Sequence, residues 1–288
     1  MSRLFNRFVV LSLIRPSITT ARDPNGFFAQ QPNAIIIREM RIKFSVEKNL
    51  GKHPNKASVT VTNLAESTRA QIKVPMIVRL EVGYDGTENL QHLFSGDLRL
   101  EDTEHSGPDV ETKLEMGEGD RAYQFAHVSQ SFRGAKVIDA VRTAASALGL
   151  DVPANVAGAP DMQAEYTGTI HGPAGGALTK LLTPAGYGWS VQEGKLVALK
   201  DDQIRPGQAI PVNEQEGMIG SPKLGVPKKP GEATQLKVKK LIDPRVVAGC
   251  TISVKSRDVN WLFRFEKVKH DGDSRSKDWY TDIDARQM

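Results

Sequence analysis

Strict alternation of apolar and polar residues constrains this chain more than any other feature of its sequence. In "RIKFSVEK", Ile42, Phe44 and Val46 fall on one side of an extended chain, and charged or polar residues fall on the other. The same period of two recurs in the segments 57–64, 77–84, 93–100 and 109–116. Successive side chains of a strand point to opposite faces of a sheet, so each segment predicts a strand with one buried face. Repeated short strands of this kind predict an antiparallel barrel or sandwich over the first ~125 residues.

Turn residues punctuate these predicted strands. Gly96 interrupts one alternating run and predicts a bulge or bend, and Asp85-Gly86 predicts a turn. After Asn63-Leu64 a short acidic and polar stretch predicts a helical turn. The apolar run from Phe8 to Ile14 ends at an Arg-Pro pair and is short for an export signal, so it predicts a first strand.

A helical period replaces the alternation after Val128. Helical spacing is shown by Val137, Ile138, Val141, Ala145 and Leu148, and Gly149 predicts the end of that helix. A second, shorter helix is predicted around Leu178, Leu181 and Leu182, and Thr183-Pro184 with Gly186 ends it. A hairpin is then predicted from 189–192 and 195–199, turning at Glu193-Gly194. Residues 128–203 therefore predict a small α+β domain.

Alternation returns after a loop-rich stretch that begins near Ile204. The apolar faces carry Leu236 and Val238, then Cys250, Ile252 and Val254, then Trp261, Phe263 and Phe265, and finally Trp279 and Ile283. The chain is thus predicted to be mainly β, with domains at 1–127 (β-barrel), 128–203 (α+β) and 204–288 (β-barrel). No other stretch approaches the length of a membrane-spanning segment.

The composition excludes few classes of protein, but it limits the kinds of partner that the chain could bind. The 288 residues carry a formal net charge of +4, with 39% hydrophobic and 25% charged residues, as in an ordinary globular protein. Lys and Arg are scattered apart from a run between Lys228 and Lys240, which favours a solvated face over a polyanion site. The single cysteine, Cys250, excludes an internal disulfide and is predicted to be a small buried residue.

Motifs for catalysis or metal binding are not found in the sequence. No two of the six histidines have the spacing of a zinc site; they are His53, His92, His105, His127, His171 and His270. "GEGDRA", residues 117–122, matches a relaxed dinucleotide loop, but its acidic residues repel phosphate and no helical stripe follows, so a turn is predicted. There is no G-x-S-x-G elbow, and the pairs Glu101-Asp102 and Asp201-Asp202 would point to opposite faces of a strand.

The segment "NWLFRFEKVKH" comes nearest to a nucleic-acid surface, because Arg264, Lys267 and Lys269 lie among aromatic residues. Its aromatics share one alternating face, however, which is typical of a core. We therefore predict no enzyme and no catalytic, cofactor-binding or metal-binding residues. The function is expected to lie in binding surfaces.

The order of several short motifs resembles the baseplate hub proteins of tailed bacteriophages. The N-terminal ones are Pro54-Asn55-Lys56-Ala57, Asn63-Leu64, Gly83-Tyr84 and Phe94-Ser95-Gly96. The segments "SQSFRGAKVIDAVRTAASALGL", "GMIGSPK" and "GDSRSKDWYTDIDA" resemble the middle and last domains of that family. The resemblance covers nearly the whole chain; residues 1–7 and "GVPKKPGE" depart from it.

This resemblance implies a homotrimer at the distal end of the tail tube, in which each chain contributes two tube-like β-barrel domains. Three copies would then present six similar positions to a sixfold tube and adapt it to a threefold tip. The implied partners are the tail tube or distal tail protein, the tip or spike protein, other baseplate proteins and the tape-measure protein. DNA would meet the chain only in transit through the lumen, with no stable membrane insertion. The implied location is the virion tail, after assembly in the host cytoplasm.

Three other functions remain open on the sequence. They are a tail-associated cell-wall-degrading enzyme, the base of a type VI secretion-like spike, and a tail-tube protein proper. The last is normally a single barrel, and the length of this chain favours two.

Overall fold

A computed structural model describes residues 6–15, 34–51, 54–84, 89–205, 207–225, 233–256 and 259–288. Most of the described strands join one sheet of 13 strands, antiparallel except where β12 pairs with β15. The predicted Asp85-Gly86 turn and most of "GVPKKPGE" lie outside the described residues. Within them, no helix is long and apolar enough to cross a membrane.

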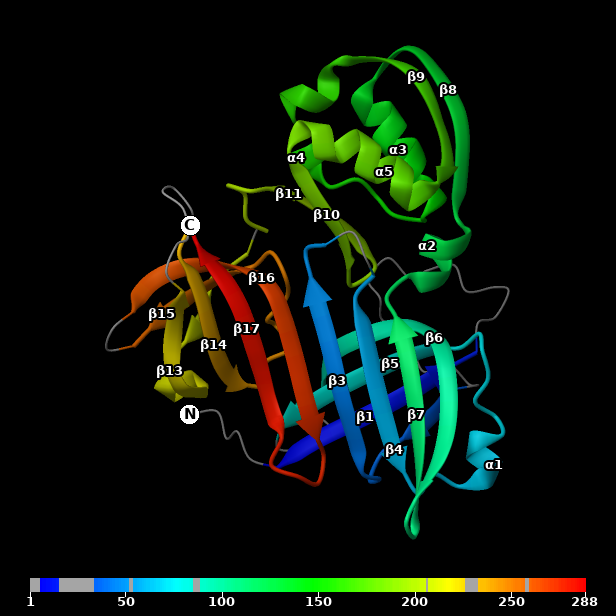
Figure 1. The fold of residues 1–288 in the computed structure, drawn as a ribbon, viewed down its shortest axis with the longest axis vertical. Coiled ribbons are helices and arrows are strands. Elements are labelled where there is room, and N and C mark those ends of the chain that lie inside the picture. The colour runs from blue at the N-terminus through cyan, green and yellow to red at the C-terminus, as the bar shows by residue number, and fades with distance from the viewer. Residues whose placement is uncertain are drawn as a thin grey trace.

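We call the part of the chain from β1 to β7 the N-terminal unit. Its elements are β1 Arg7–Ile14, β2 Ala34–Ile37, β3 Ile42–Asn49, β4 Lys56–Thr62, α1 Glu66–Arg69, β5 Ile77–Tyr84, β6 Gln91–Ser106 and β7 Asp109–Gly117. The predicted first strand and the helical turn after Asn63-Leu64 are both present, as β1 and α1. Figure 1 shows β1 running obliquely behind β3 and β4, so that the apolar faces of the two layers meet.

The middle unit contains the helices and stands above the strands in Figure 1. Its elements are α2 Asp120–Phe125, β8 His127–Lys136, α3 Val137–Ala147, α4 Ala154–Ala157, η2 Pro160–Gln163, β9 Glu165–Pro173, α5 Ala174–Leu182, η3 Thr183–Ala185, β10 Tyr187–Gln192 and β11 Lys195–Lys200. Both predicted helices and the predicted hairpin are confirmed. Gly149 has a φ of 68°, and Glu193 and Gly194 have φ values of 55° and 73°. These are the left-handed conformations that a helix end and a two-residue hairpin turn require.

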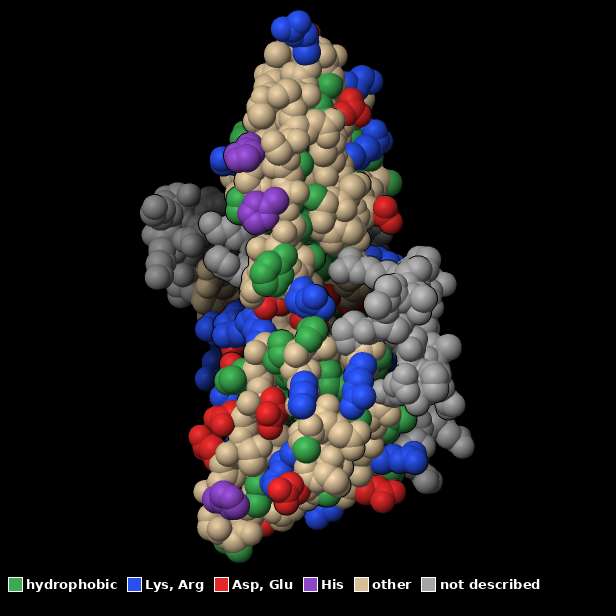
Figure 2. All heavy atoms as spheres, turned by 90° about the vertical axis from the view of Figure 1, so that its right-hand side faces the viewer, with side chains coloured by type: hydrophobic (Ala, Val, Ile, Leu, Met, Phe, Trp, Pro, Cys, Tyr) green, Lys and Arg blue, Asp and Glu red, His purple; other side chains and the backbone are tan. Residues whose placement is uncertain are grey.

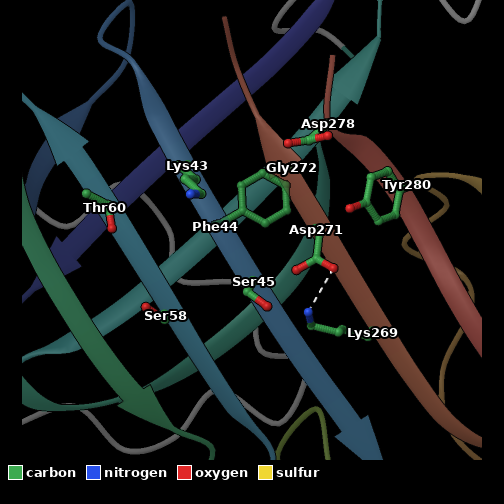
Figure 3. A pocket seen from close by; sticks show the side chains of 10 residues that line it. All are labelled: Lys43, Phe44, Ser45, Ser58, Thr60, Lys269, Asp271, Gly272, Asp278 and Tyr280. Carbon is green, nitrogen blue, oxygen red and sulfur yellow. Dashed lines mark ion pairs between the residues drawn. The ribbon is translucent and has the colours of Figure 1, made fainter. Parts of the chain in front are cut away.

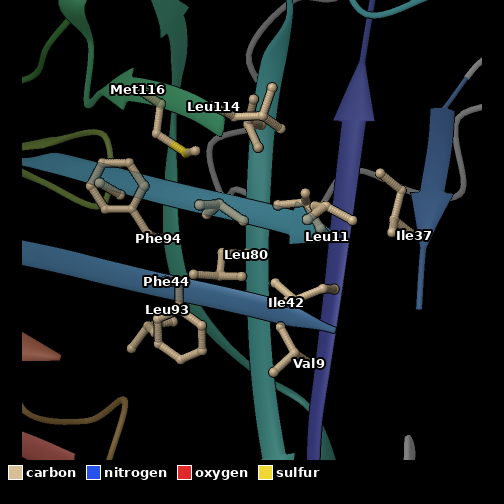
Figure 4. Packing of buried hydrophobic residues seen from close by; sticks show 14 of the residues in the cluster. Val9, Leu11, Ile37, Ile42, Phe44, Leu80, Leu93, Phe94, Leu114 and Met116 are labelled. Carbon is tan, nitrogen blue, oxygen red and sulfur yellow. The ribbon is translucent and has the colours of Figure 1, made fainter. Parts of the chain in front are cut away.

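The C-terminal unit is again made of strands. Its elements are β12 Ile210–Val212, η4 Glu214–Glu216, β13 Met218–Gly225, β14 Gln235–Leu241, β15 Thr251–Lys255, β16 Asn260–Asp273 and β17 Trp279–Gln287. Each of the three units has its own cluster of buried apolar side chains. Figure 4 shows part of the first cluster, where Leu11 of β1, Ile42 of β3 and Leu80 of β5 face one another.

The sheet runs unbroken from one β unit into the other. Its order is β13-β14-β17-β16-β3-β4-β7-β6-β5-β1-β2, with β15 beside β16 and β12 beside β15. No strand pairing among the described residues closes either unit on itself, so the predicted pair of closed barrels is not confirmed. The physical reason is that an edge of β3 bonds to β16 of the C-terminal unit, where a closed barrel would use a strand of its own unit.

The two β units repeat one strand order. The N-terminal unit has β3-β4-β7-β6-β5, and the C-terminal unit has β13-β14-β17-β16-β15. The register repeats as well, because Ile77 pairs with Asp97 as Thr251 pairs with Arg264. Two positions after Asp97 and after Arg264, each long strand has one extra residue that its partner strand does not match, Arg99 in β6 and Glu266 in β16. The chain therefore contains the same five-stranded arrangement twice.

The sequence predicted a bulge or bend at Gly96, but the bulges of this strand are not at that residue. The irregular positions of β6 flank it, between Phe94 and His92 and between Leu98 and Leu100. A Cβ at residue 96 would lie 2.8 Å from the carbonyl oxygen of Gly117 on β7. Glycine is needed there because two backbones approach closely.

Candidate functional site

Asn55, from the first family-like motif, lies where the N-terminal and middle units meet. The residue is only 1% exposed. Its Nδ2 lies 2.8 Å from Oε2 of Glu118, 3.0 Å from the carbonyl oxygen of Val191 and 3.0 Å from Oε1 of Gln192. Its Oδ1 accepts a bond of 3.0 Å from the backbone N–H of Asn49. One side chain thus joins the β3–β4 connection, the end of β7 and the β10–β11 turn.

Glu118 completes this junction from the segment "GEGDRA". Its Oε1 accepts from the backbone N–H of Gly194 at 3.0 Å, and its own N–H donates to the carbonyl of Asn55 at 2.9 Å. Burial raises the pKa of the Glu118 carboxyl, while Lys48 acts to lower it. The expectation that no helix follows this segment is wrong, because α2 begins at Asp120. The Glu118 carboxylate bonds to Asn55 and Gly194, so its role in this segment is to hold the junction.

Lys48 was missed by the sequence reasoning, although the alternation contains its signal. It follows Ile42, Phe44 and Val46 on the same face of β3 and is 2% exposed. Burial lowers the pKa of its amine, and Glu118 acts in the opposite direction. Lys240 likewise follows Leu236 and Val238 on the inner face of β14 and is 2% exposed. A lysine that continues an apolar face is therefore the mark of a buried amine in this chain.

The Gly83-Tyr84 motif lies at the seam of the two β units. Tyr84 Oη donates to the carbonyl of Ile242 at 2.9 Å, and its ring meets Trp279 edge-on at 6.1 Å. Phe44 of β3 meets the same indole at 5.7 Å. Gly272 lies between them in the sheet, because it pairs with Phe44 on one side and with Trp279 on the other. The absent side chain leaves the room that the two rings fill.

An ion pair and two hydrogen bonds extend this seam. Arg41 Nη2 lies 2.8 Å from Oδ2 of Asp273. Ser274 Oγ accepts from the N–H of Ile42 at 3.0 Å and donates to the carbonyl of Met40 at 3.2 Å. The contacts cross between β3 and the β16–β17 turn, so they hold the two units in one relative position.

The residues weighed for nucleic-acid binding have structural roles or lie apart. Nη1 of Arg264 lies 2.7–3.0 Å from the carbonyl oxygens of Lys200, Asp201 and Gln203, so the side chain holds the loop after β11. Phe263 and Phe265 are buried as predicted, but Trp261 is 48% exposed. Trp261 pairs with the buried Val254, and its ring lies 6.5 Å from that of Phe263 without joining the buried cluster. Cys250 is half-buried against the C-terminal core.

A surface hollow of about 340 Å³ lies over the seam, on the outer face of β3, β4, β16 and β17. Figure 3 shows its lining, in which Lys269 pairs with Asp271 at 3.0 Å. Along one register row of this face the charges alternate in sign across five strands: Lys239, Asp282, Lys269, Glu47 and Lys56. Ion pairs of 3.3 Å join Lys239 to Asp282 and Lys56 to Glu47. The face therefore offers neutralised charges in place of a continuous band of cations.

Groups for chemistry do not converge on this hollow. Within the described ranges no three His, Cys, Asp or Glu residues are grouped to hold a metal. Burial lowers the pKa of His270 to about 3 and that of His92 to about 4. His270 bonds to Thr281 Oγ1 at 2.8 Å and His92 to Ser95 Oγ at 2.7 Å. The absence of catalytic and metal-binding residues stays a prediction.

Among the open sheet edges of the described residues, two belong to the strands of the repeated five-stranded arrangement. One is the outer edge of β13, which pairs only with β14. The other is the β5-side edge of β6 beyond Asp97, where the pairing with β5 stops. Figure 2, which views the molecule from the side on which β6 lies in Figure 1, shows acidic and basic side chains interspersed, with no broad apolar patch on the β part. Exposed backbone edges of this kind are sites at which another chain can add a strand.

Comparisons with known proteins agree with this picture. The model of the family described as baseplate hub gp41 matches residues 25–285. No curated protein matches the chain in sequence. The 43 kDa tail protein of prophage MuSo2 from Shewanella oneidensis has a similar fold, with a TM-score of 0.64 at 8% identity over 97% of this chain and 96% of that one. A tail protein from Neisseria meningitidis gives 0.62 at 11% identity over 98% and 97%. An Escherichia coli component of the type VI secretion system gives 0.57 at 11% identity over 86% and 74%.

Proposed function

Since the chain belongs to the family of baseplate hub proteins, we propose that it forms a trimeric ring at the distal end of a bacteriophage tail. The observation that carries this proposal is the five-stranded arrangement that each chain contains twice. Three chains would supply six such units around one axis, so a threefold hub would match a sixfold tail tube. The ring would adapt that tube to a threefold tip or spike and line the channel for genome ejection.

We further propose that the chain has three domains, at 1–127, 128–203 and 204–288. Three separate clusters of buried apolar residues support this division. Ile242 and Trp279, however, belong by sequence to the last domain and pack in the first cluster. The first and last domains would therefore behave as one rigid body, with the middle domain held at the Asn55 junction.

The proposed partners follow from the position of the ring. The tail tube or distal tail protein would bind one side and the tip or spike protein the other, with other baseplate proteins at the rim and the tape-measure protein at the lumen. DNA would touch the ring only in passage, which suits a face whose charges are paired. The role would be structural, as the family's description as a baseplate hub suggests.

Electron cryo-microscopy of assembled tails tests this function. We expect three copies in one ring, with six five-stranded units at similar radius around the tail axis. Six copies in a ring, or copies away from the axis, would contradict the proposal. A zymogram on peptidoglycan tests the enzymatic alternative, and clearing by the purified chain would favour a tail-associated lytic enzyme.

The base of a type VI secretion spike is the second candidate. The similarity of fold to the Escherichia coli type VI component favours it. The two candidates differ in what they assemble with, so affinity purification of the chain from producing cells separates them. Recovery with phage tail-tube and tape-measure proteins supports the hub, and recovery with secretion-system components supports the spike base.

A further inference from the structure

Each of the two five-stranded arrangements leaves one edge open, the outer edge of β13 in one and the β5-side edge of β6 beyond Asp97 in the other, and we propose that these edges pair with each other between neighbouring copies. Residues 100–106 of β6 in one copy would bond antiparallel to β13 of the next. This inference rests on the proposed ring and names the contact that closes it. The ring would then be held by continuous sheet, both within and between chains.

The template for this contact is the seam that exists within each chain. β16 divides one of its edges between two partners. Residues 260–264 pair with β15, and residues 267–273 pair with residues 43–49 of β3. The change of partner occurs at the extra residue, Glu266.

β6 is the counterpart of β16 and shows the same division with one partner missing. Its residues 91–97 pair with β5 as residues 260–264 pair with β15. Its extra residue is Arg99, and its residues 100–106 correspond to 267–273. No strand among the described residues occupies the β5-side edge of 100–106.

β13 is the counterpart of β3 and also lacks one partner. β3 lies between β4 and β16, whereas β13 has β14 on one side and no described strand on the other. The repeat therefore predicts that β13 of one copy meets β6 of another just as β3 meets β16.

Exposure of the β13 edge agrees with a contact that a single chain leaves open. Leu224 of β13 is 41% exposed, whereas Val46, its counterpart on β3, is 0% exposed at the intrachain seam. Pairing would shelter the Leu224 side chain, which now meets water.

Charge supports the same register. Transferring the pairs of the β16–β3 seam places Glu104 opposite Lys223, as Asp271 is opposite Ser45. The β6 segment also carries Glu101 and Asp102, whereas the described residues of β13 carry no acidic side chain. Opposite charges on facing strands favour pairing, and like charges disfavour it.

The geometry permits closure into a ring. Figure 1 shows β13 on the left side of the β part and β6 on its right side. Different surfaces on opposite sides make a head-to-tail contact, which forms a closed ring when the rotation between copies divides a full turn. If the contact within the chain and the contact between chains have the same geometry, three copies repeat one step six times.

Disulfide trapping in assembled tails tests the pairing. Glu104→Cys and Lys223→Cys are combined with Cys250→Ser, so that no other thiol is present. Facing residues of antiparallel strands have Cα atoms about 4.5–5.5 Å apart, within the range of a disulfide. We expect disulfide-linked dimers and closed trimers on a non-reducing gel of the purified tails. The matched control pairs Lys223→Cys with Lys113→Cys, which lies one strand further on β7 and should stay monomeric.

The outcomes separate this inference from the proposed function. Tails that contain the chain but show no more cross-linking at 104–223 than the control would overturn the strand pairing and leave the hub function standing. Tails that lack the chain altogether would overturn both.

Charge exchange provides a second, independent test. Lys223→Glu faces Glu104 with a like charge and should weaken each contact about fivefold, or about a hundredfold for a closed ring of three. Adding Glu104→Lys should restore incorporation into tails to within about threefold of the original chain. Both variants are expected to melt at the original temperature, because both side chains are exposed. A double variant that incorporates less well than Lys223→Glu alone would refute the register.

Discussion

Replacing Asn55 by alanine is expected to destabilise the junction of the N-terminal and middle units by about 4 kcal/mol. The side-chain nitrogen of Asn55 carries two hydrogens, so it can make two strong bonds to the three acceptors that surround it. One of these bonds goes to the Glu118 carboxylate. The third bond is the one that Oδ1 accepts from Asn49. A hydrogen bond to a charged group contributes about 1.5–3 kcal/mol and one to a neutral group about 1 kcal/mol. The partners of Asn55 are buried, so water does not replace the bonds that they lose.

Urea unfolding followed by tryptophan fluorescence measures this loss, since Trp189 lies on β10 next to the junction. Hydrogen exchange at the amides of Asn49 and Gly194 localises it, because both amides donate within the same network. Both should exchange faster in the Asn55→Ala variant, while amides of α3 keep their protection.

Asn155→Ala is the matched control for this experiment. Asn155 is exposed and makes a single bond, from Nδ2 to the carbonyl of Ala198 at 2.8 Å, so its loss should cost under about 1 kcal/mol. Asn55→Asp keeps the shape but places a second carboxylate beside Glu118, and it should destabilise more at pH 8 than at pH 5. An Asn55→Ala variant no less stable than Asn155→Ala would refute the account of the junction.

Three further predictions test the seam, the buried histidine and the loop after β11. Gly272→Ala places a Cβ 2.4 Å from the ring of Phe44 and should lower the stability by about 2 kcal/mol, measured by thermal denaturation. The control Gly225→Ala makes only ordinary contacts and should leave the stability unchanged. Equal melting temperatures of the two variants would contradict the packing of Gly272 against Phe44. The buried, neutral His270 binds a proton when the chain unfolds below pH 6.5. The stability of the folded chain should therefore fall by up to about 1.4 kcal/mol per pH unit below pH 6.5. Urea titrations at several pH values measure this slope, and His270→Gln should flatten it. A parallel slope in the variant would show that His270 titrates normally in the folded chain. Arg264→Ala leaves three loop carbonyls without their donor and should lower the free energy of unfolding in urea by about 3 kcal/mol. The control Lys267→Ala removes an exposed neighbouring side chain and should change it little. Similar losses in both variants would contradict the role of the Arg264 guanidinium.

Local patterns in the sequence predicted the elements well. Alternation identified β3, β4, β5, β7 and β14, because a half-buried strand needs a period of two. Gly149 marked the end of α3, and Glu193-Gly194 marked the turn of the hairpin, since both positions need a left-handed backbone. These signals depend on each segment and its immediate neighbours alone.

The pairing of distant strands could not be predicted in the same way. β3 bonds to β16 through backbone groups that every residue carries, so the side chains do not reveal which edges meet. Gly96 shows the same limit, because the close approach of Gly117 that requires it comes from another strand. Burial of Trp261 was predicted from its alternation with Phe263, but about half of the residue is exposed although its strand partner Val254 is buried, so alternation does not fix how completely a large side chain is covered.

The candidate site was partly visible in the sequence. The motif residues Asn55 and Tyr84 were singled out by resemblance, and both make contacts between units. The three acceptors around Asn55 Nδ2 are separated from it by 63 to 137 positions, so its role as a junction required coordinates. Lys48 and Lys240 were available as charged residues continuing an apolar face, and a stricter reading of the alternation would have found them.

The equal register of the two five-stranded arrangements means that one polypeptide carries the same structural module twice. Joining two modules in one polypeptide turns every second encounter between molecules into a folding step within one molecule. A ring of six modules then needs three associations instead of six, and its assembly depends less steeply on concentration. The two modules also differ at corresponding places: the permanent seam has Gly272 opposite Trp279, where the open edge of β6 has His105 opposite Val110.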